Sequence, residues 1–575
     1  MPAGSGAYRR ETSIMIEESP VRRPFQLGAV AVTLAAASMA ASALPAIAAP
    51  PATAPAASAK GPAASGLPAT PLPLGPADLP ETRDTVELAP GVDLTTIVRG
   101  AATTTDGWQD RVLLPPDGQA GSTPDATKAT RALGSKQTAE AVAGQLRAAG
   151  FGPTLLPVNT PAFVGVPAGT VGYEVRLGHY AKQADLAPQE QQLKAAGFKY
   201  GGVWTAEDAN STNGPWRVYV LSVDPHKFDG HIASAMGSSV DVRTHLTTLA
   251  ERYGALAGTN GSYGTAYGDT AGIHVADGQL LSEANNGRTG LILTDHGRKT
   301  SLRIDQLWTH LSVSSNDHAQ TTLSGFNRHP GEILDCGGRP DDQPTSIPQH
   351  DVTCKNPNEL VQFTSEFGAN SFTGTAPGVE VTLNAAGTVT AVQESLGAAI
   401  PAGGSTVQGI GTGAEWLRQH AQVGRRLRFD ERVTDSKGRT VPLRRGVSMI
   451  GAGPTLVRDG KEYVTAQTDG LVHVDGDPTF YDNWVARRNG RTMIGTDARG
   501  RILMVAADGR NPGVSVGLTI GETAGVMRAL GATSALNLDG GGSTAMVRGS
   551  ELVNHPSDAT GERFYADVLL LLPRT

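Results

Sequence analysis

The segment S-A-L-N-L-D-G-G-G-S-T-A-M-V occupies residues 534–547 and predicts both a fold and a site. Residues 535–538 have the length and apolar composition of a buried strand, so Asp539 is expected at its carboxyl end, where open α/β sheets present ligand sites. The three glycines at 540–542 carry no β-carbon, and their backbone N–H groups can face an anion. The motif predicts a carboxylate beside an anion-binding turn, although a plain tight turn capped by an aspartate fits the same residues.

A second strand and a helix are predicted just before this motif. Residues 501–507 form an apolar run of strand length, and residues 520–530 show a helical pattern. Thr519 and Glu522 fit a capping box at the start of that helix. The order strand, helix, strand predicts a βαβ crossover with a parallel pair of strands, and therefore an α/β fold with a mixed sheet. Both strands would end at Asp-Gly turns on one edge of that sheet.

Further motifs follow one another in a fixed order along the chain. They are G-A-L-A-G-T-N-G-S-Y at 254–263, F-N-R at 326–328, T-S-E-F-G at 364–368, G-A-G-P-T-L-V-R-D-G at 451–460, R-T-M-I-G at 491–495, A-D-G-R at 507–510, G-L-T-I-G-E at 517–522, N-L-D-G-G-G-S at 537–543 and N-H-P-S-D at 554–558. Over residues 216–573 this set resembles the phosphodiester glycosidase family. The chain departs from the family pattern at Gly264, where an aromatic residue is usual, and at Asn489-Gly490, where Asn-Pro is frequent.

The resemblance implies hydrolysis of the glycosidic bond of a sugar-1-phosphodiester, with α-N-acetylglucosamine 1-phosphate linkages as the expected substrate. This reaction needs a carboxylate at the anomeric carbon and arginines at the phosphate. Asp539 is the first candidate carboxylate and Glu522 the second, with Asp508 behind them, and Glu522 can also be explained as a helix cap. Candidates for binding the sugar or the phosphate are Arg491, Arg510, Arg328, Thr492, Asn260, Asn537, Gly540, Gly541, Ser543, His555 and Asp558.

Three alternatives remain open at the level of sequence. Asp508, Asp539 and Asn537 could equally hold a divalent cation such as calcium through oxygen. Residues 541–545 resemble the elbow of a serine hydrolase with Ser543 as nucleophile, but the residues that follow read as a strand instead of the required helix. The third alternative is a non-catalytic protein that only binds peptidoglycan or polysaccharide.

The N-terminal residues predict export. Residues 1–49 combine Arg22-Arg23 with an Ala-rich apolar stretch and small residues at 46–48, which is typical of a signal peptide, with a twin-arginine signal left open. Residues 50–82 are rich in proline and alanine and predict an extended linker. No later segment is long and apolar enough to span a bilayer, so a secreted or cell-wall-associated protein is expected. The formal net charge of −7 argues against a nucleic-acid partner.

Residues 83–215 precede the predicted catalytic domain at 216–575 and contain an internal repeat. L-R-A-A-G-F at 146–151 returns as L-K-A-A-G-F at 193–198, each time at the end of a helical pattern and before a strand-like run. This duplication predicts a small α/β repeat module. The region resembles the sporulation-related repeat, which implies binding of peptidoglycan glycan strands, although a plain packing or tethering role fits the same pattern.

The chain has only two cysteines, Cys336 and Cys354, and both lie in a polar insertion. In an exported protein this arrangement predicts a structural disulfide that closes one surface loop.

Overall fold

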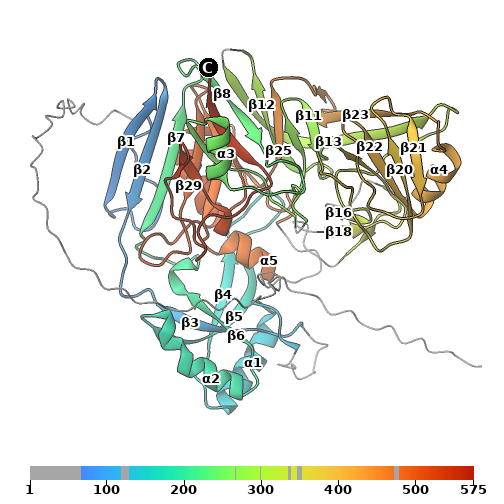
Figure 1. Cartoon of the computed structure of the whole chain (residues 1–575). Coiled ribbons are helices and arrows are strands. Elements are labelled where there is room, and N and C mark those ends of the chain that lie inside the picture. The colour runs from blue at the N-terminus through green and yellow to red at the C-terminus, as the bar shows by residue number, and fades with distance from the viewer. Residues whose placement is uncertain are drawn as a thin grey trace, which may run out of the picture. The chain divides into compact units, whose positions relative to one another are not determined.

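An eight-stranded sheet carries the C-terminal motifs. The computed structural model describes residues 66–117, 128–265, 267–297, 299–334, 339–345, 352–471 and 478–574. The strands of this central sheet, in spatial order, are β1 (Glu81–Ala89), β2 (Val92–Arg99), β7 (Trp216–Val223), β29 (Ile502–Ala507), β28 (Arg491–Asp497), β30 (Ala532–Asn537), β26 (Thr455–Arg458) and β27 (Lys461–Glu462). Figure 1 shows β1, β2, β7 and β29 side by side in this sheet. Apolar side chains bury both faces of β29 and β30, as their continuous apolar runs predict.

Helix α6 (Ile520–Ala529) connects β29 to β30 and starts at the predicted capping box. The Thr519 hydroxyl accepts the backbone N–H of Glu522, and the Glu522 carboxylate accepts the backbone N–H of Thr519. The prediction of an α/β fold with a mixed sheet is confirmed. Strands β29 and β30 run in the same direction but are not neighbours, because β28 lies between them and is antiparallel to both. The sequence does not predict that β28 lies between the two parallel strands, because β28 precedes β29 in the chain and forms a hairpin with it.

The other sheets either lie beside the central one or are formed by residues 274–451, here named the insertion. A five-stranded sheet contains β32 (Glu551–Leu552), β31 (Met546–Arg548), β9 (Ala257–Asn260), β33 (Val568–Pro573) and β8 (Gly230–Ala235), with α3 (Leu246–Tyr253) beside it. A second eight-stranded sheet contains β11 (Gln279–Ser282), β10 (His274–Ala276), β25 (Val447–Gly451), β12 (Thr289–Asp295), β13 (Thr300–Ser315), β23 (Leu427–Asp435) and β24 (Thr440–Val441), with β14 (Gln320–Thr322) on β13.

Two smaller sheets complete the insertion. One contains β15 (Gly325–Phe326), β19 (Leu360–Thr364), β22 (Ser405–Ile410), β20 (Gly378–Leu383) and β21 (Val389–Gln393), with α4 (Thr412–His420) packed on it. The other contains β16 (Glu332–Leu334), β18 (Val352–Lys355) and β17 (Gln343–Pro344). Cys354 in β18 is fully buried and is not a free thiol. Cys336 lies outside the described residues, so the disulfide stays a prediction.

The internal repeat forms a separate four-stranded sheet, here named the α/β module. Its elements in chain order are β3 (Trp108–Val112), α1 (Lys136–Ala148), β4 (Thr154–Thr160), β5 (Gly169–Tyr180), α2 (Ala187–Ala195) and β6 (Tyr200–Trp204). The order in the sheet is β4-β5-β3-β6, which is the split βαβ arrangement. Both helices pack on one face (Figure 1), where Leu146 and Leu193, the first residues of the two repeats, are fully buried.

Strands β1 and β2 precede the module but belong to the central sheet, because β2 pairs with β7 along its whole length. The predicted signal peptide and residues 50–65 of the predicted linker lie outside the described residues. The described remainder of the linker is not simply extended, because Leu72 and Leu74 are buried in the core on the central sheet. In the part of the chain that the structure describes, no helix has the length and apolarity needed to span a membrane.

Candidate functional site

Asp539 follows β30 directly and is fixed by its backbone. Its N–H donates to the carbonyl of Gly261 at 3.1 Å, and its own carbonyl accepts from Asn260 Nδ2 at 2.9 Å. Its Oδ1 accepts the N–H of Gly540 at 2.8 Å. Burial raises the pKa of Asp539 to about 6, although hydrogen bonds from the Ser543 side chain and Gly540 N–H oppose the rise. The carboxylate is therefore partly desolvated and held in one orientation.

Three residues that were predicted to bind the substrate instead form hydrogen bonds that hold this turn in place. Asn260 Oδ1 accepts from the Thr492 hydroxyl at 2.6 Å and from the Ala545 N–H at 3.0 Å. Asn537 Nδ2 donates to the carbonyl of Gly453 and to the Tyr263 hydroxyl, both at 3.1 Å. Asn260, Thr492 and Asn537 are all fully buried. Their polar groups position Asp539, and none of the three lines the pocket described next.

A pocket of about 400 Å³ opens beside the glycine turn. The residues that line it are Arg111, Val203, Glu207, Asn483, Trp484, Arg487, Arg488, Asn489, Arg510, Gly540, Gly541, Gly542 and Arg563. Five of them are arginines, and Glu207 is the one carboxylate among these described lining residues. Guanidinium groups bind phosphate oxygens in pairs. The lining therefore suits an anionic ligand placed against the glycine turn.

Arg510 and Arg563 both line the pocket close to the glycine turn. Arg510 has a φ of 50°, an uncommon value for a residue with a side chain. Its Nη2 lies 3.3 Å from Ser557 Oγ and 3.9 Å from Asp558 Oδ1. Arg563 Nε pairs with Asp558 Oδ2, and a β-carbon added to Gly542 would lie 2.6 Å from Arg563 Nη2. Asp558 thus links two arginines at the edge of the pocket.

Arg491 lies under the turn instead of inside the pocket. Its side chain is fully buried, with Nε donating to the carbonyl of Leu518 at 2.9 Å and Nη2 to that of Trp484 at 2.6 Å. Its Nη1 has no hydrogen-bond partner among the described residues. A β-carbon added to Gly540 would lie 3.7 Å from Arg491 Cδ, so Arg491 and Asp539 flank the same glycine. Burial lowers the pKa of Arg491 to about 10, which leaves it charged at neutral pH.

Asp508 and His555 form a hydrogen-bonded pair next to the glycine turn. Asp508 is buried, and its Oδ2 lies 3.0 Å from His555 Nδ1 and 3.2 Å from the Tyr219 hydroxyl. Burial raises the pKa of Asp508, and hydrogen bonds from His555 and Asn554 oppose the rise. The Asn554 side chain also bonds the carbonyl of Thr544, just after the turn. The His555 side chain is half exposed, so part of its ring is accessible to solvent.

Glu522 lies outside the pocket. Besides closing the capping box, its Oε1 accepts from Arg488 Nη2 at 2.7 Å. The structure thus favours the explanation of Glu522 as a helix cap and ion-pair partner.

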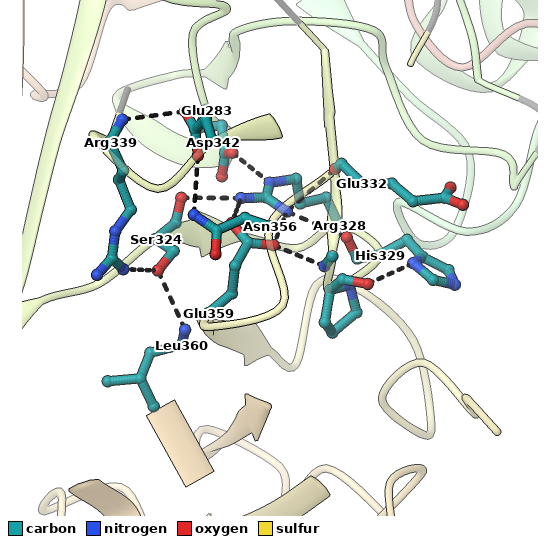
Figure 2. Close-up of polar contacts among 12 residues, drawn as sticks. Glu283, Ser324, Arg328, His329, Glu332, Arg339, Asp342, Asn356, Glu359 and Leu360 are labelled. Atoms are coloured by element: carbon teal, nitrogen blue, oxygen red, sulfur yellow. Dashed lines mark hydrogen bonds and ion pairs between the residues drawn. The ribbon is translucent and has the colours of Figure 1, made fainter. Parts of the chain in front are cut away.

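Arg328 does not line this pocket and instead lines a separate one together with Glu283 and Glu359. Its guanidinium contacts Glu283 and donates to both oxygens of Glu359, at 2.6 and 2.9 Å, as Figure 2 shows. Burial alone would lower the pKa of Arg328, but the two carboxylates raise it above its ordinary value. This guanidinium therefore makes hydrogen bonds to carboxylates of the protein itself, which indicates a structural role.

Sequence reasoning missed several lining residues. Arg487 and Arg488 directly precede Asn489-Gly490, and a pair of arginines next to a glycine could have drawn attention to them. Arg111 and Glu207 come from the α/β module, more than 270 residues before Asn489, and no local motif marks them. Within the described residues, no cluster of three His, Cys, Asp or Glu side chains is arranged to hold a metal ion.

Comparison with known proteins defines the class. Residues 377–572 match the family model described as phosphodiester glycosidase, so this part of the chain carries a domain of this class. The chain belongs to the same family as a candidate exported protein of Burkholderia pseudomallei. The sequence of this chain is 33% identical to that protein, and its structure matches the crystal structure of that protein with a TM-score of 0.77. The match covers 88% of this chain and 99% of that one. A structure from Synechocystis shares only the fold, at 15% identity and a TM-score of 0.50 over 86% of this chain and 76% of that one.

Curated relatives match a shorter stretch. The N-acetylglucosamine-1-phosphodiester alpha-N-acetylglucosaminidase of Mus musculus is 28% identical over 117 residues, which is 20% of this chain and 22% of that protein. The protein of the same name from Homo sapiens is 29% identical over 129 residues, which is 22% of this chain and 24% of that protein. This chain therefore matches less than a quarter of the length of each.

Proposed function

We propose that the protein is a hydrolase that cleaves the glycosidic bond of sugar-1-phosphodiesters. The observation that carries the proposal is the position of the Asp539 carboxylate at a glycine turn that lines an arginine-rich pocket. The names of the curated relatives support α-N-acetylglucosamine as the sugar. The predicted signal peptide and the exported relative support a secreted or cell-wall-associated enzyme that acts on a cell-envelope or extracellular glycan.

In this proposal Arg510 and Arg563 hold the phosphate and neutralise the charge that develops on it as the glycosidic bond breaks. Asp539 faces the anomeric carbon, which becomes positive in the transition state, and either attacks it or activates water. The buried charge of Arg491 adds positive potential behind the glycine turn. His555, oriented by Asp508, transfers the proton that the water or the leaving group requires.

A serine hydrolase is less well supported. The Ser543 side chain hydrogen-bonds Asp539, and the chain continues into β31 instead of a helix. The nucleophile elbow of such enzymes requires a helix directly after the serine.

Product analysis tests the proposal. Purified protein is incubated with an α-N-acetylglucosamine 1-phosphodiester, and the products are identified by NMR. We expect free N-acetylglucosamine and a phosphate monoester, and a decrease of at least about a hundredfold in kcat for Asp539→Asn. Release of N-acetylglucosamine 1-phosphate would show cleavage of the other ester bond. Binding of glycan with no release of sugar from any such diester would support a non-catalytic role. A parallel assay with a chelator tests the metal requirement.

A further inference from the structure

Three residues that line the pocket come from the α/β module and its following turn. Arg111 lies on β3, Val203 on β6, and Glu207 in the turn after β6. They line the same pocket as Gly540, Gly541 and Arg563 of the phosphodiester glycosidase domain. The module is thus part of the wall of the candidate active site.

Buried polar contacts fix the module against residues 479–488. Arg111 Nη1 pairs with Asp482 Oδ2 at 2.9 Å, and Arg487 Nη2 pairs with Glu207 Oε2 at 2.9 Å. The backbone N–H of Arg488 donates to the carbonyl of Glu207 at 2.7 Å. Asp482 and Arg487 are both buried, so separating these pairs would leave charges without partners, at a cost of several kcal/mol. The wall is therefore a fixed part of the pocket.

The short segment from Arg487 to Gly490 limits how far the residues of the α/β module can lie from the glycine turn. Gly490 accepts the N–H of Gly541 at 2.8 Å, while Arg487 contacts Glu207. Arg487 and Gly490 are three residues apart, so their Cα atoms are separated by at most about 11 Å. A glycosyl phosphate bound at the turn would leave room toward Val203 and Glu207 for the group on the other side of the phosphate.

We propose that the α/β module forms the binding subsite for the leaving group and selects phosphodiesters whose alcohol side is a sugar or another polyol. The inference rests on the proposed function, because it assigns the glycine turn to the glycosyl phosphate. Glu207 accepts hydrogen bonds from hydroxyl groups, Arg111 donates them, and Val203, which is largely buried, adds a small apolar contact where it lines the pocket. This role differs from tethering to a separate glycan strand, since the bound residue is part of the substrate.

The test compares two diesters of α-N-acetylglucosamine 1-phosphate, one with methanol and one with the 6-hydroxyl of a hexose. Val203→Trp should fill the subsite and reduce kcat/KM for the hexose diester at least tenfold, while the methyl diester changes less than threefold. Glu207→Gln, which preserves shape but removes the charge that pairs with Arg487, should shift the ratio in the same direction, with thermal unfolding reporting any loss of stability. Lys194→Trp, on the exposed surface of α2, serves as the matched control and should change neither substrate. Thermal unfolding shows whether each variant is folded.

Binding provides a readout that does not depend on turnover. In the Asp539→Asn background, calorimetry should show tighter binding of the hexose diester than of the methyl diester, and Val203→Trp should remove this difference. Equal binding of the two diesters, or equal loss of both in Val203→Trp, overturns the inference. If the wild type releases sugar from neither diester while the difference in binding persists, the proposed hydrolysis fails and the subsite stands.

Discussion

Asp508 holds His555 through two atoms. Its Oδ1 accepts the backbone N–H of His555 at 2.9 Å, and its Oδ2 lies 3.0 Å from Nδ1 of the same residue. A buried carboxylate on Nδ1 fixes the orientation of the ring, which leaves Nε2 as the nitrogen for proton transfer. We expect His555→Gln to lower kcat by about 10² to 10⁴, the range for loss of a general acid or base.

Asp508 acts through His555 in this arrangement, so the two losses should not multiply. The variant Asp508→Asn should lower kcat, and the double variant should be no slower than His555→Gln alone. Steady-state kinetics across pH provide the measurement, and both single variants should lose the same limb of the pH profile. Multiplying losses would show that Asp508 contributes independently of His555.

We expect the buried carboxylate of Asp539 to lower the stability of the folded protein at neutral pH. Burial raises its pKa from the ordinary value of 3.8 to about 6, so the folded state binds a proton more tightly than the unfolded state. Between these two values, stability therefore falls as the pH rises, and at neutral pH the ionised carboxylate costs up to about 3 kcal/mol. We expect Asp539→Asn to be more stable than the wild type at pH 7.5, with the difference shrinking toward pH 4. Urea unfolding at several pH values measures it.

The activity of the wild type should change over the same range. If Asp539 reacts as a carboxylate, kcat/KM should decrease as the pH falls through about 6. A stability difference that is constant across pH, or a lower stability of Asp539→Asn at pH 7.5, would contradict this account of the carboxyl group.

Gly542 has no room for a side chain. A β-carbon there would lie 2.3 and 2.5 Å from the carboxylate oxygens of Asp558 and 2.6 Å from Arg563 Nη2. The ends of both side chains would have to move, so we expect Gly542→Ala to displace Arg563 and to raise KM about tenfold, with the fold retained. Titration with substrate measures this effect.

A glycine with free space around it provides the control. Gly144 lies inside α1, and a β-carbon there would meet no atom within 4 Å. Gly144→Ala should leave KM unchanged and stabilise the protein by about 0.5–1 kcal/mol. A KM for Gly542→Ala equal to that of this control would show that Arg563 does not contact the substrate.

The helix and strands around the glycine turn could be predicted from the sequence, because residues close together in the chain specify them. The apolar run before Asp539, the capping box of Thr519 and Glu522, and the repeated Leu-x-Ala-Ala-Gly-Phe segments each depend on neighbours in sequence. The position of β28 between β29 and β30 depends on strand pairing over long distances, which periodicity does not encode.

Side-chain roles were harder to predict than elements. Arginine at a strand end can face a ligand or bury its charge, and sequence does not distinguish Arg510 in the pocket from Arg491 beneath it. The contribution of Arg111 to the pocket depends on how β3 packs against residues 479–488, which no motif records.

Arg328 illustrates the same difficulty and allows a sharp test. Its guanidinium pairs with both Glu283 and Glu359 (Figure 2), and both carboxylates are largely buried. Arg328→Met would leave them without their partner, which typically costs about 3–5 kcal/mol. We expect a lower free energy of unfolding at pH 7.5 but an unchanged KM in the folded protein. As a control in the same insertion, Arg418→Met breaks the exposed pair with Glu394, which water screens, and should leave the free energy of unfolding nearly unchanged.

The pH dependence distinguishes this structural role from a role in binding. Burial raises the pKa of Glu283 even with Arg328 beside it, and removal of the cation should raise that pKa further. Since a carboxyl with a raised pKa in the folded state gains a proton as the pH falls, the destabilisation of Arg328→Met should decrease between pH 7.5 and pH 5. Unchanged stability at every pH, together with a raised KM, would instead place Arg328 at the substrate.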